Sequence, residues 1–288
     1  MINDVKCAAI ILNYNDADNA ISLSRTLSSY AIVDNIIIVD NCSTDNSWAI
    51  LSDFSIAKVS CYKSNYNGGY GFGNNFGIRI AKNIFNCKLA FICNTDISVS
   101  EECLDSLASI LINYPNAAIC SSIQINGFNN QEIKGTTWNV PTAFDYIRNS
   151  LLILKYIFPQ HYDVYIQPVQ EVGCVAGAFL GVDIDRFLSF GGYDEEVFLF
   201  CEESIIGYKA KSYGYKTYID SRHNYYHYHS TSINKSYPKE ISKIKILFQS
   251  RKTYLYKYLK IHGLKKLWIE FVFSIAMLEH RLKNLFFT

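Results

Sequence analysis

Short apolar runs separated by polar turns dominate the first part of the chain and predict buried strands. Cys7–Leu12, Ile36–Val39 and Leu89–Cys93 are continuous runs without polar alternation, and Val59–Tyr62 is a shorter candidate of the same kind. Such runs are typical of a parallel sheet that carries helices on both sides. The pattern therefore predicts an α/β fold that opens with a strand, a helix and a second strand.

Stretches with three- and four-residue apolar spacing lie between these runs and predict helices. Asp45 is the expected N-cap of the second helix, and Pro115 is expected to end the fourth. The expected helices cover about 19–30, 48–51, 74–84 and 101–114, and a further strand is expected over Ala117–Ile125.

The end of the chain has a different pattern. Residues 126–170 are loop-rich and aromatic, but from about residue 235 the spacing is helical, and the last apolar residues recur beside basic ones. This is typical of an amphipathic basic helix. We therefore expect one α/β domain over 1–234 and a helical extension over 235–288. The recurring apolar residues are Trp268, Phe271, Val272, Ile275, Leu278, Leu282 and Leu285.

The charge is divided in the same way. The whole chain has a net charge of +1, but residues 235–288 hold 12 Lys+Arg against 3 Asp+Glu, a net +9, and residues 1–234 hold 15 against 23. A basic amphipathic segment is typical of peripheral attachment to an anionic membrane surface. A helical cap on the domain or a homodimer contact is the alternative. Nucleic-acid binding is not expected, because the basic segment has no recognisable reading motif.

The cysteines and the ends of the apolar runs indicate a cytoplasmic protein. The nine cysteines are scattered and none is spaced C-x-x-C, as expected for reduced thiols. The first dozen residues lack the basic region and cleavage site of a signal peptide. Phe271–Leu278, the longest late apolar run, lies between Glu270 and Glu279 and is far shorter than the roughly 20 residues of a spanning helix.

Candidate chemistry gathers where the predicted strands end. Asn94-Thr95-Asp96 follows a buried run, and open α/β sheets bind ligands beyond the carboxyl ends of their strands. Mg²⁺ and Mn²⁺ prefer oxygen ligands and are commonly held by one or two carboxylates plus substrate phosphates. Asp96 is therefore a candidate ligand for a metal that bridges the phosphates of a nucleotide sugar. A helix cap or turn is the alternative.

A glycine-rich segment precedes the third predicted helix. Residues 67–77 contain five glycines, which allow backbone N–H groups to approach a phosphate or ribose at a helix N-terminus. The spacing Gly71-x-Gly73-x-x-x-Gly77 does not fit the Rossmann dinucleotide motif, and the segment does not follow the first strand. A dehydrogenase is therefore not favoured.

Two further clusters offer acid–base or ligand groups. Glu202 and Glu203 follow an aromatic segment, where a carboxylate can acquire a raised pKa and act as a general base. Alternatively, these acids simply begin a helix. His223, His227 and His229 lie within seven residues, but no cysteine or acid stands at zinc spacing, so we expect at most one to bind a metal or phosphate.

In this order the motifs resemble the inverting family-2 glycosyltransferases of the GT-A fold, especially the bacterial rhamnosyltransferase-like branch that builds surface polysaccharides. The resemblance covers roughly residues 7–255. It implies a Rossmann-like, mostly parallel sheet flanked by helices, with a nucleotide-sugar half over about 1–125 and an acceptor half over about 126–234. It rests on Leu12-Asn13-Tyr14-Asn15, residues 39–47, residues 67–77, Asn94-Thr95-Asp96, Gly177-Ala178-Phe179, residues 191–195, Glu202-Glu203, and His227 followed by Ser232.

The resemblance implies roles for particular residues. One group contacts the base and ribose of the nucleotide, and the glycine-rich loop lines the donor site. A metal, Mg²⁺ or Mn²⁺, has two protein ligands, and His229 is the alternative to the histidine ligand. Glu203 stands where the family has its catalytic carboxylate, with Glu202 as the alternative base. The residues implied are Asn13, Tyr14 and Asp40 for the nucleotide, Asn67, Gly69, Gly73 and Asn75 for the loop, and Asp96 and His227 for the metal.

The chain departs from the family pattern at four positions. Glu203 replaces the usual aspartate, Ile205 replaces an acid often found two positions later, and Lys209 replaces a common arginine. Asn94 replaces the first acid of the Asp-x-Asp form. These changes leave the expected fold intact and affect only the expected site.

The implied activity is transfer of a sugar, with inversion, from dTDP-rhamnose or a UDP-hexose to a glycan acceptor. The acceptor is expected to be linked to a polyprenyl diphosphate, in synthesis of O-antigen, capsule or another cell-surface polysaccharide. A sugar nucleotidyltransferase would need a basic triphosphate loop near the first strand, where this chain has Asn13-Tyr14-Asn15-Asp16. A catalytically inactive carbohydrate- or nucleotide-sugar-binding protein is the other alternative.

Overall fold

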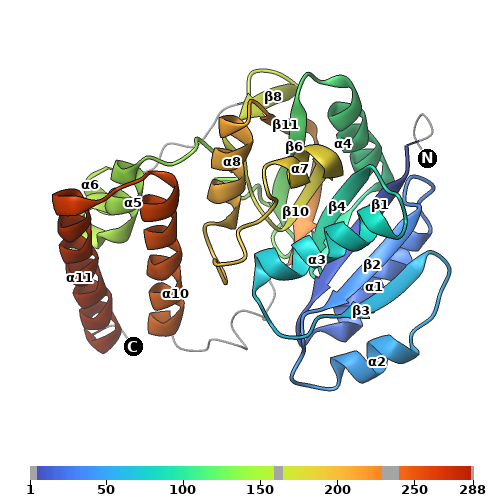
Figure 1. Cartoon of the computed structure of the whole chain (residues 1–288), viewed down its shortest axis with the longest axis horizontal. Helices are drawn as coiled ribbons and strands as arrows, with labels where there is room; N and C mark the ends of the chain where they lie inside the picture. The colour runs from blue at the N-terminus through green and yellow to red at the C-terminus, as the bar shows by residue number, and fades with distance from the viewer. Residues whose placement is uncertain (1–4, 159–164, 229–239, 287–288) are drawn as a thin grey trace.

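The computed structural model describes residues 5–158, 165–228 and 240–286. A nine-stranded sheet forms the centre, in the order β3-β2-β1-β4-β10-β6-β11-β5, with β8 paired to β11. Helices cover the sheet, and a group of helices extends to one side (Figure 1). The predicted α/β class and helix-flanked sheet are confirmed.

The predicted strands of the first part of the chain form the parallel part of the sheet. β1 (Cys7–Asn13) lies between β2 (Asn35–Asp40) and β4 (Leu89–Asn94), and β3 (Val59–Lys63) is the edge strand beside β2. The residues of β1, β2 and β4 are almost all buried, as their unbroken apolar runs require. The polar residues at the strand ends therefore meet at one edge.

The rest of the sheet is mixed. β10 (Phe179–Asp183) runs antiparallel to both β4 and β6 (Ala117–Asn126), and β11 (Lys216–His227) runs parallel to β6. Two short strands, β5 (Ile97–Val99) and β8 (Val169–Val172), pair antiparallel with β11. Only the first half of the sheet is thus parallel throughout, because the second half is not built from repeated strand–helix–strand units.

Helices on opposite faces of the sheet build two separate cores. Leu27 and Leu107 belong to one core, and Ile78 and Phe187 belong to the other. The first face carries α1 (Ala17–Ser28), α2 (Ser47–Asp53) and α4 (Glu101–Asn113), and the second carries α3 (Tyr70–Asn83), α7 (Ile184–Ser189) and α8 (Glu202–Ser212).

Two helix starts differ from the prediction. Asn46, not Asp45, is the N-cap of α2, and Asp45 instead accepts a hydrogen bond from the Ser47 N–H at 2.9 Å. α3 begins at Tyr70, four residues before the predicted start. Gly71, Gly73 and Gly77 therefore lie within the helix. Gly73 and Gly77 have no side chain, and this allows α3 to lie close against β1 and β2.

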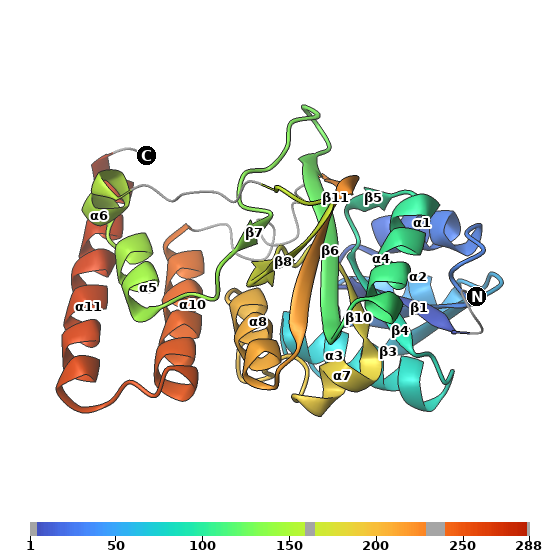
Figure 2. The same ribbon diagram turned by 90° about the horizontal axis from the view of Figure 1, so that it is seen from above.

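A helical appendage packs beside the sheet domain. It consists of α5 (Ala143–Ser150), α6 (Leu152–Ile157), α10 (Glu240–Thr253), the π-helical turn Tyr254–Tyr258 and α11 (Gly263–Phe286). Figure 2 shows these helices together at one end of the molecule. Residues 126–170, which have no clear sequence pattern, thus supply α5, α6 and the short strand β7 (Thr137–Trp138), which pairs with β9 (Cys174–Val175).

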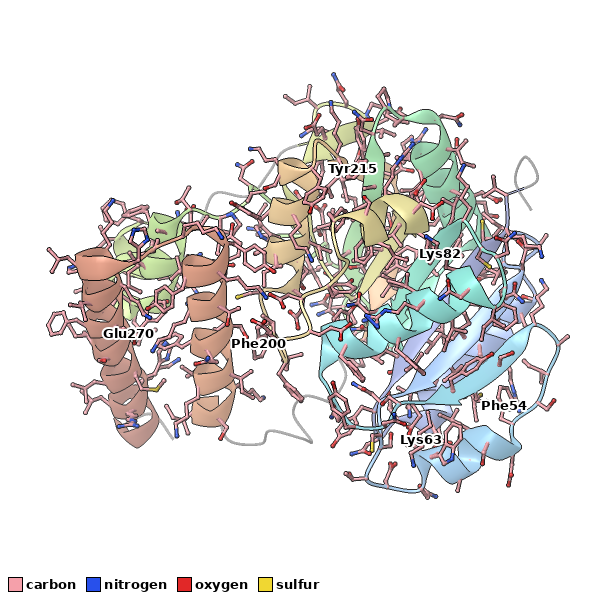
Figure 3. All side chains as sticks on the ribbon, in the orientation of Figure 1. Phe54, Lys63, Lys82, Phe200, Tyr215 and Glu270 are labelled. Carbon is pink, nitrogen blue, oxygen red and sulfur yellow. The ribbon has the colours of Figure 1, made fainter. Side chains whose placement is uncertain are left out.

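The appendage has its own hydrophobic core, which continues into the sheet domain. Phe248 of α10 stacks on Phe273 of α11 with ring centroids 5.1 Å apart, and Cys201 and Ile205 from the start of α8 are buried in the same cluster. Glu270 of α11, labelled in Figure 3, accepts hydrogen bonds from Lys252 and Tyr256, which joins α11 to α10 and to the π-helical turn. The appendage is therefore packed against α8 by apolar contacts.

None of the helices in the described part of the chain combines the length and hydrophobicity that a membrane crossing requires.

Candidate functional site

Asn13 and Asp40 end neighbouring parallel strands and face each other. The Asn13 side-chain amide donates to Asp40 Oδ1 at 2.8 Å, and the Ser43 hydroxyl donates to the same oxygen at 2.5 Å. Asn13 and Asp40 are both fully buried. Tyr14, the next residue after the strand, is half-buried. The structure thus brings the three predicted nucleotide-binding residues to one strand edge.

The loop before α3 is joined to this edge through Asn41. Its side-chain amide donates to Asn67 Oδ1 at 3.0 Å and to the Gly69 carbonyl at 2.9 Å. Gly69 has φ +90° and lies against the Phe198 backbone, to which the Tyr70 N–H donates at 3.0 Å. A side chain at position 69 would have no room there. Asn67 and Gly69 therefore shape the loop through direct contacts.

Gly73 and Asn75 have packing roles in the structure. A Cβ at Gly73 would lie 2.3 Å from a methyl group of Leu12, so this glycine lets α3 approach β1. The Asn75 amide donates to the Tyr193 carbonyl and to Glu195, and its oxygen accepts from the Tyr193 N–H. The side chain of Asn75 is thereby fully engaged by the 193–195 segment. The predicted binding of the nucleotide by Gly73 and Asn75 stays a prediction. The packing and hydrogen bonds of these two residues within the protein do not favour it.

Asp96 and His227 come together from different strands. Asp96 follows β4, His227 ends β11, and His227 Nε2 lies 3.2 Å from Asp96 Oδ2. Both side chains are largely buried. Gln124 of β6 approaches the other ring nitrogen, with its Nε2 at 2.6 Å from His227 Nδ1. The predicted pair is thus adjacent, and Gln124 orients the imidazole ring.

This pair fits a divalent cation that also binds phosphate. The described residues contain no group of three or more His, Cys, Asp or Glu side chains arranged for a metal, so the protein offers one carboxylate and one imidazole. Such a partial set leaves coordination positions for diphosphate oxygens and water, as is common for Mg²⁺ and Mn²⁺. For Nε2 of His227 to bind a metal, the proton must lie on Nδ1 and Gln124 must present its oxygen.

His223, the other described histidine of the predicted cluster, is not at this site. His223 Nδ1 lies 2.9 Å from the buried carboxylate of Asp220, which also pairs with Arg222. These three groups, with Ser106, form a separate network that lowers the Asp220 pKa to about 2 through hydrogen bonds to Arg222, Ser106 and His223, against the effect of burial. His229 lies outside the described residues.

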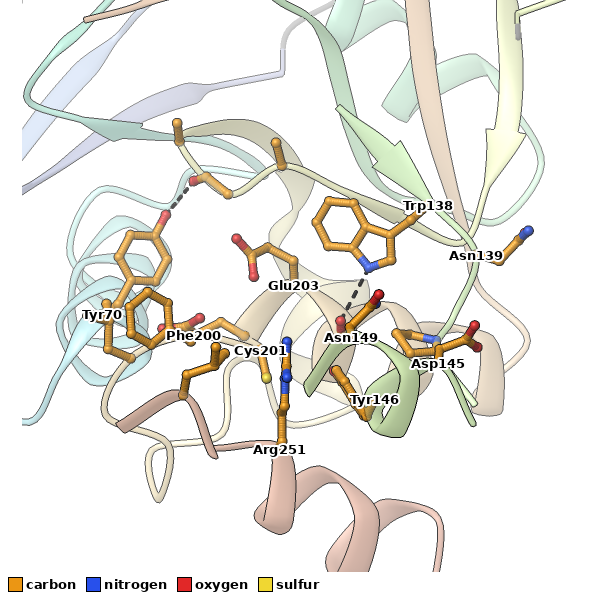
Figure 4. A pocket seen from close by; sticks show the side chains of 18 of the residues that line it. Tyr70, Trp138, Asn139, Asp145, Tyr146, Asn149, Phe200, Cys201, Glu203 and Arg251 are labelled. Atoms are coloured by element: carbon orange, nitrogen blue, oxygen red, sulfur yellow. Dashed lines mark hydrogen bonds between the residues drawn. The ribbon is translucent and has the colours of Figure 1, made fainter. Parts of the chain in front are cut away.

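Glu202 and Glu203 begin α8 at the wall of a cavity. Phe200 and Cys201 both have positive φ, 71° and 66°, and this turn directs the first residues of α8 inward. Glu203 points into the cavity (Figure 4) and lies so close to Gly177 that a Cβ there would be 2.7 Å from Glu203 Oε1. Glu202 is only 6% exposed, and its Oε1 has no hydrogen-bond partner among the described residues.

Burial raises the pKa of both carboxyl groups. For Glu202, burial and then the neighbouring Glu203 raise the pKa to about 8. For Glu203, burial is again the main cause of a raised pKa, opposed by backbone N–H groups at Glu203 and Gly177. A pair of this kind retains a proton at a pH where ordinary glutamates are ionised.

The remaining members of the acidic cluster have structural roles. Asp194 accepts hydrogen bonds from Tyr258 at 2.6 Å and from Lys257 at 3.1 Å, which joins it to the appendage. Glu195 pairs with Arg79 and Asn75 of α3. Thus the structure divides the predicted cluster, and only Glu202 and Glu203 face the cavity.

The cavity has a volume of about 670 Å³ and lies between the sheet domain and the appendage. The cavity is not lined by Asn13, Tyr14 or Asp40. It therefore lies beside the strand edge, away from the ends of β1 and β2. Aromatic and basic residues from segments without a clear sequence pattern form one wall, which sequence reasoning missed. The lining includes Tyr70, Gln124, Trp138, Tyr146, Arg148, Glu203, His227 and Arg251.

Several solved structures share this fold. Mannosyltransferase PcManGT from Pyrobaculum calidifontis, in complex with GDP-Man and Mn²⁺, has a TM-score of 0.56 and 13% identity, over 98% of this chain and 76% of its own. GalNAc-T7 with UDP, GalNAc and Mn²⁺ has a TM-score of 0.57 and 12% identity, over 94% of this chain and 55% of its own. S. aureus TarS has a TM-score of 0.51 and 15% identity, over 87% of this chain and 44% of its own. At these identities the similarity shows the fold alone.

Sequence similarity leads to a family. No curated protein sequence matches the chain. A family model described as Glycosyl transferase family 2 matches residues 9–172, which is more than half of the chain and includes the strand edge, the glycine-rich loop and Asp96. Together with a sheet of the GT-A type, this match shows that the chain belongs to glycosyl transferase family 2.

Proposed function

We propose that this glycosyltransferase moves a hexose or deoxyhexose from a nucleotide-diphosphate sugar to a glycan acceptor with inversion at the anomeric carbon. The observation that carries the proposal is the position of Glu203. Its carboxylate enters a cavity whose wall also holds His227, which lies 3.2 Å from Asp96. A base and a cation-binding pair beside one cavity are the groups that a single displacement at a sugar phosphate requires.

Asp96 and His227 would hold Mg²⁺ or Mn²⁺, and the metal would supply positive charge for the departing diphosphate. The structures of the mannosyltransferase and of GalNAc-T7 both contain Mn²⁺ with a nucleotide or nucleotide sugar. Gln124 would fix the His227 ring in its ligand orientation. The buried network of Asn13, Asp40 and Ser43 would present the strand edge to the nucleoside.

Glu203 would remove the proton from the acceptor hydroxyl. Its raised pKa makes it a stronger base than an exposed glutamate, and the packing of Gly177 against its carboxylate fixes its position. Glu202 is more deeply buried, and we assign it a secondary role. When Glu202 is ionised it raises the basicity of Glu203, and when it is protonated this effect is lost.

The donor we favour is dTDP-rhamnose or a UDP-hexose, on the motif order of the rhamnosyltransferase-like branch. The acceptor would be a glycan on a polyprenyl diphosphate, in O-antigen, capsule or related cell-surface polysaccharide synthesis in bacteria. Such an acceptor places the enzyme at the cytoplasmic face of a membrane, where a basic appendage favours binding to anionic lipids. A homodimer contact through the appendage is the alternative. Vesicle flotation and light scattering distinguish it from membrane binding.

The direct test is sugar release from a panel of UDP-, dTDP- and GDP-linked sugars with Mn²⁺. We expect one donor to yield nucleoside diphosphate, and the first sugar anomer detected by proton NMR to have inverted configuration. Glu203→Gln should lower the rate by at least about 100-fold. Glu196→Gln, which alters an exposed acid paired with Lys257, is the matched control and should keep the wild-type rate.

Either of two results would contradict this assignment. Near-normal turnover by Glu203→Gln would remove its role as base, and release of the sugar with retained configuration would exclude a single displacement. Because the carboxylate form is the base, we also expect the wild-type rate to fall as the pH decreases through a pKa above the ordinary range of glutamate.

A further inference from the structure

The appendage places two arginines in the wall of the catalytic cavity. Arg251 comes from the last turn of α10, and Arg148 comes from α5. In Figure 4 Arg251 enters the cavity beside Cys201 and Tyr146, and Glu203 lies across the cavity from it. Asn13 and Asp40 do not line this cavity, so we assign the arginines to the acceptor side.

Arg251 is largely buried, and the described part of the chain supplies it with no counter-ion. Among the residues that the structure describes, no acidic side chain forms an ion pair with it, and its only side-chain hydrogen bond is from Nη1 to Ser150 Oγ at 2.5 Å. Its Nε is buried and has no acceptor. The rings of Tyr146 and Phe248 lie 5.5 and 5.8 Å from its guanidinium carbon. A guanidinium has five N–H donors, and among the described residues only the Ser150 hydroxyl accepts from this one.

Arg148 has a similar environment. Its side chain is 16% exposed, and its ion pair with Asp145 is long, at 3.5 Å. Its Nε is also buried and has no acceptor within the described ranges. Asp145 is meanwhile engaged as the capping-box partner of Thr142. Two guanidinium groups thus line one cavity, and each has an orphaned donor.

A buried cation is costly unless an anion or hydrogen-bond acceptors accompany it. Glu202 and Glu203 line the same cavity but form no ion pair with either arginine. A guanidinium binds phosphate or carboxylate through two parallel hydrogen bonds. We propose that Arg251 and Arg148 bind an oxyanion of the acceptor, a phosphate or carboxylate, and so hold the reacting hydroxyl beside Glu203.

This inference rests on the proposed function but concerns a different part of the site. It predicts that the enzyme selects an anionic acceptor, and that the appendage acts in substrate recognition as well as in folding. The arginines are positioning residues for the acceptor, and the metal and nucleoside sites do not depend on them.

The test measures anion binding through Trp138, which lines the cavity and donates to Ser204 Oγ at 3.3 Å. The chain has three tryptophans, so Trp48→Phe with Trp268→Phe leaves Trp138 as the reporter. Inorganic phosphate is titrated at constant ionic strength in EDTA, with chloride as the reference salt. We expect a saturable fluorescence change, and Arg251→Gln should weaken phosphate binding at least about tenfold.

Control variants separate binding from folding. Lys252→Gln alters the neighbouring cation, which pairs with Glu270 outside this cavity, and should bind phosphate like the parent chain. Arg148→Gln should weaken binding independently, and Arg251→Lys should retain part of it. Thermal unfolding of each variant shows whether it is folded at the temperature of the titration.

The outcomes are distinct. No saturable response to phosphate, or equal binding by the parent, Arg251→Gln and Arg148→Gln, would overturn the proposal. Competition between phosphate and a metal-bound nucleoside diphosphate would also overturn it, because the arginines would then belong to the donor site. Tighter binding of isopentenyl diphosphate than of glucuronate would assign the anion to a lipid-linked acceptor, and the reverse order would assign it to an acidic sugar. Failure of the proposed function itself appears elsewhere, as absent nucleotide binding.

Discussion

The two glutamates at the start of α8 differ in their surroundings although they are adjacent. Glu203 faces the cavity, whereas Glu202 is almost fully buried and its Oε1 lacks a hydrogen-bond donor in the described structure. The N-terminal end of a helix favours anions, but burial disfavours the charged form more strongly here, and the Glu202 pKa rises to about 8. The pair is therefore expected to retain a proton at neutral pH, because burial disfavours two charged carboxylates side by side.

This difference predicts a pH-dependent effect of Glu202→Gln on stability. Because the folded-state pKa of Glu202 is raised, the folded protein loses stability as the pH rises from the unfolded-state pKa towards about 8. The neutral glutamine avoids this loss. We expect Glu202→Gln to raise the unfolding midpoint at pH 8.5 by roughly 5 °C and to have no such effect below about pH 4.5.

Thermal unfolding from about pH 4 to 9 measures this effect. Glu196→Gln is the control, because its side chain is exposed and pairs only with Lys257 on the surface. A gain in midpoint that is independent of pH, or larger in acid, would show that Glu202 is not the buried proton carrier.

Gln124 is expected to act through His227. Its contact with Nδ1 orients the ring, and removal of such an outer partner typically lowers metal affinity by about 10- to 100-fold. Gln124→Ala should therefore need more Mn²⁺ for nucleotide-dependent thermal stabilisation, and Gln124→Glu, which can accept from Nδ1, should recover most of the affinity. Unchanged Mn²⁺ dependence in Gln124→Ala would remove the residue from the metal site.

Sequence reasoning located some of these residues and missed others for physical reasons. Asp96 could be named because it follows a buried apolar run and has a side chain suited to a cation, and His227 was named through the resemblance to family 2. Gln124, Arg148 and Arg251 gave no such signal, because their importance depends on which strands and helices become neighbours. Tertiary contacts also decide that Gly73 serves helix packing and that the side chain of Asn75 is occupied by the 193–195 segment.

At the scale of elements, α11 has two apolar faces. Ile269, Val272, Phe273 and Ala276 are buried against α10 and α5. A second stripe remains exposed and will be called the outer stripe. It consists of Leu264, Leu267, Trp268, Phe271, Ile275, Leu278 and Leu282, each at least 39% exposed. The predicted stripe therefore needs correction at Val272, which belongs to the core, whereas Trp268, Phe271, Ile275, Leu278 and Leu282 are exposed.

The outer stripe, next to exposed lysines 265 and 266, favours binding to an anionic membrane surface. We expect the wild-type chain to co-float with phosphatidylglycerol vesicles at low salt and less with phosphatidylcholine. Trp268→Ser combined with Phe271→Ser and Leu278→Ser should abolish flotation without lowering the unfolding midpoint by much, because these side chains are exposed. Ile84→Ser, at an exposed apolar position on the sheet domain, is the matched control.

Flotation that is equal in all variants, or absent in wild type, would contradict membrane binding. If the wild-type chain is instead a dimer by light scattering and the triple variant is a monomer, the outer stripe is a homodimer contact. Point substitutions are preferable to truncation near Leu264, because removal of α11 would expose Phe248 and the rest of the appendage core.

The strands were predictable at this scale, but α5 and α6 were not. Long unbroken apolar runs identify central strands regardless of their partners. α5 and α6 have only eight and six residues. The buried apolar side chains of α5 are explained by contact with α11, which lies more than a hundred residues later in the chain, and α6 has no buried residue. The departure at Ile205 has the same origin, because this residue is fully buried in the appendage core, where an acid would lack a partner.

At the scale of the whole molecule, the domain and the appendage share one cavity. Glu203 and His227 come from the domain, whereas Tyr146 and Arg251 come from the appendage. Lys257 and Tyr258 of the π-helical turn bind Asp194, which also fixes the position of the appendage. The predicted domain boundary at residue 234 stays a prediction. In the structure, α5 and α6 before this residue and α10 and α11 after it build the appendage together.

The measurement that tests the account most directly is a thermal-shift panel of the full chain with UDP, dTDP, GDP and CDP, each with and without Mn²⁺, in wild type and Asp96→Asn. We predict that one diphosphate stabilises the wild type only when metal is present, by about 2.7 kcal/mol at a hundredfold excess over its dissociation constant, and that Asp96→Asn removes this effect. Absence of stabilisation by every diphosphate, or full stabilisation of Asp96→Asn, would contradict a metal-dependent nucleotide-sugar site at this strand edge.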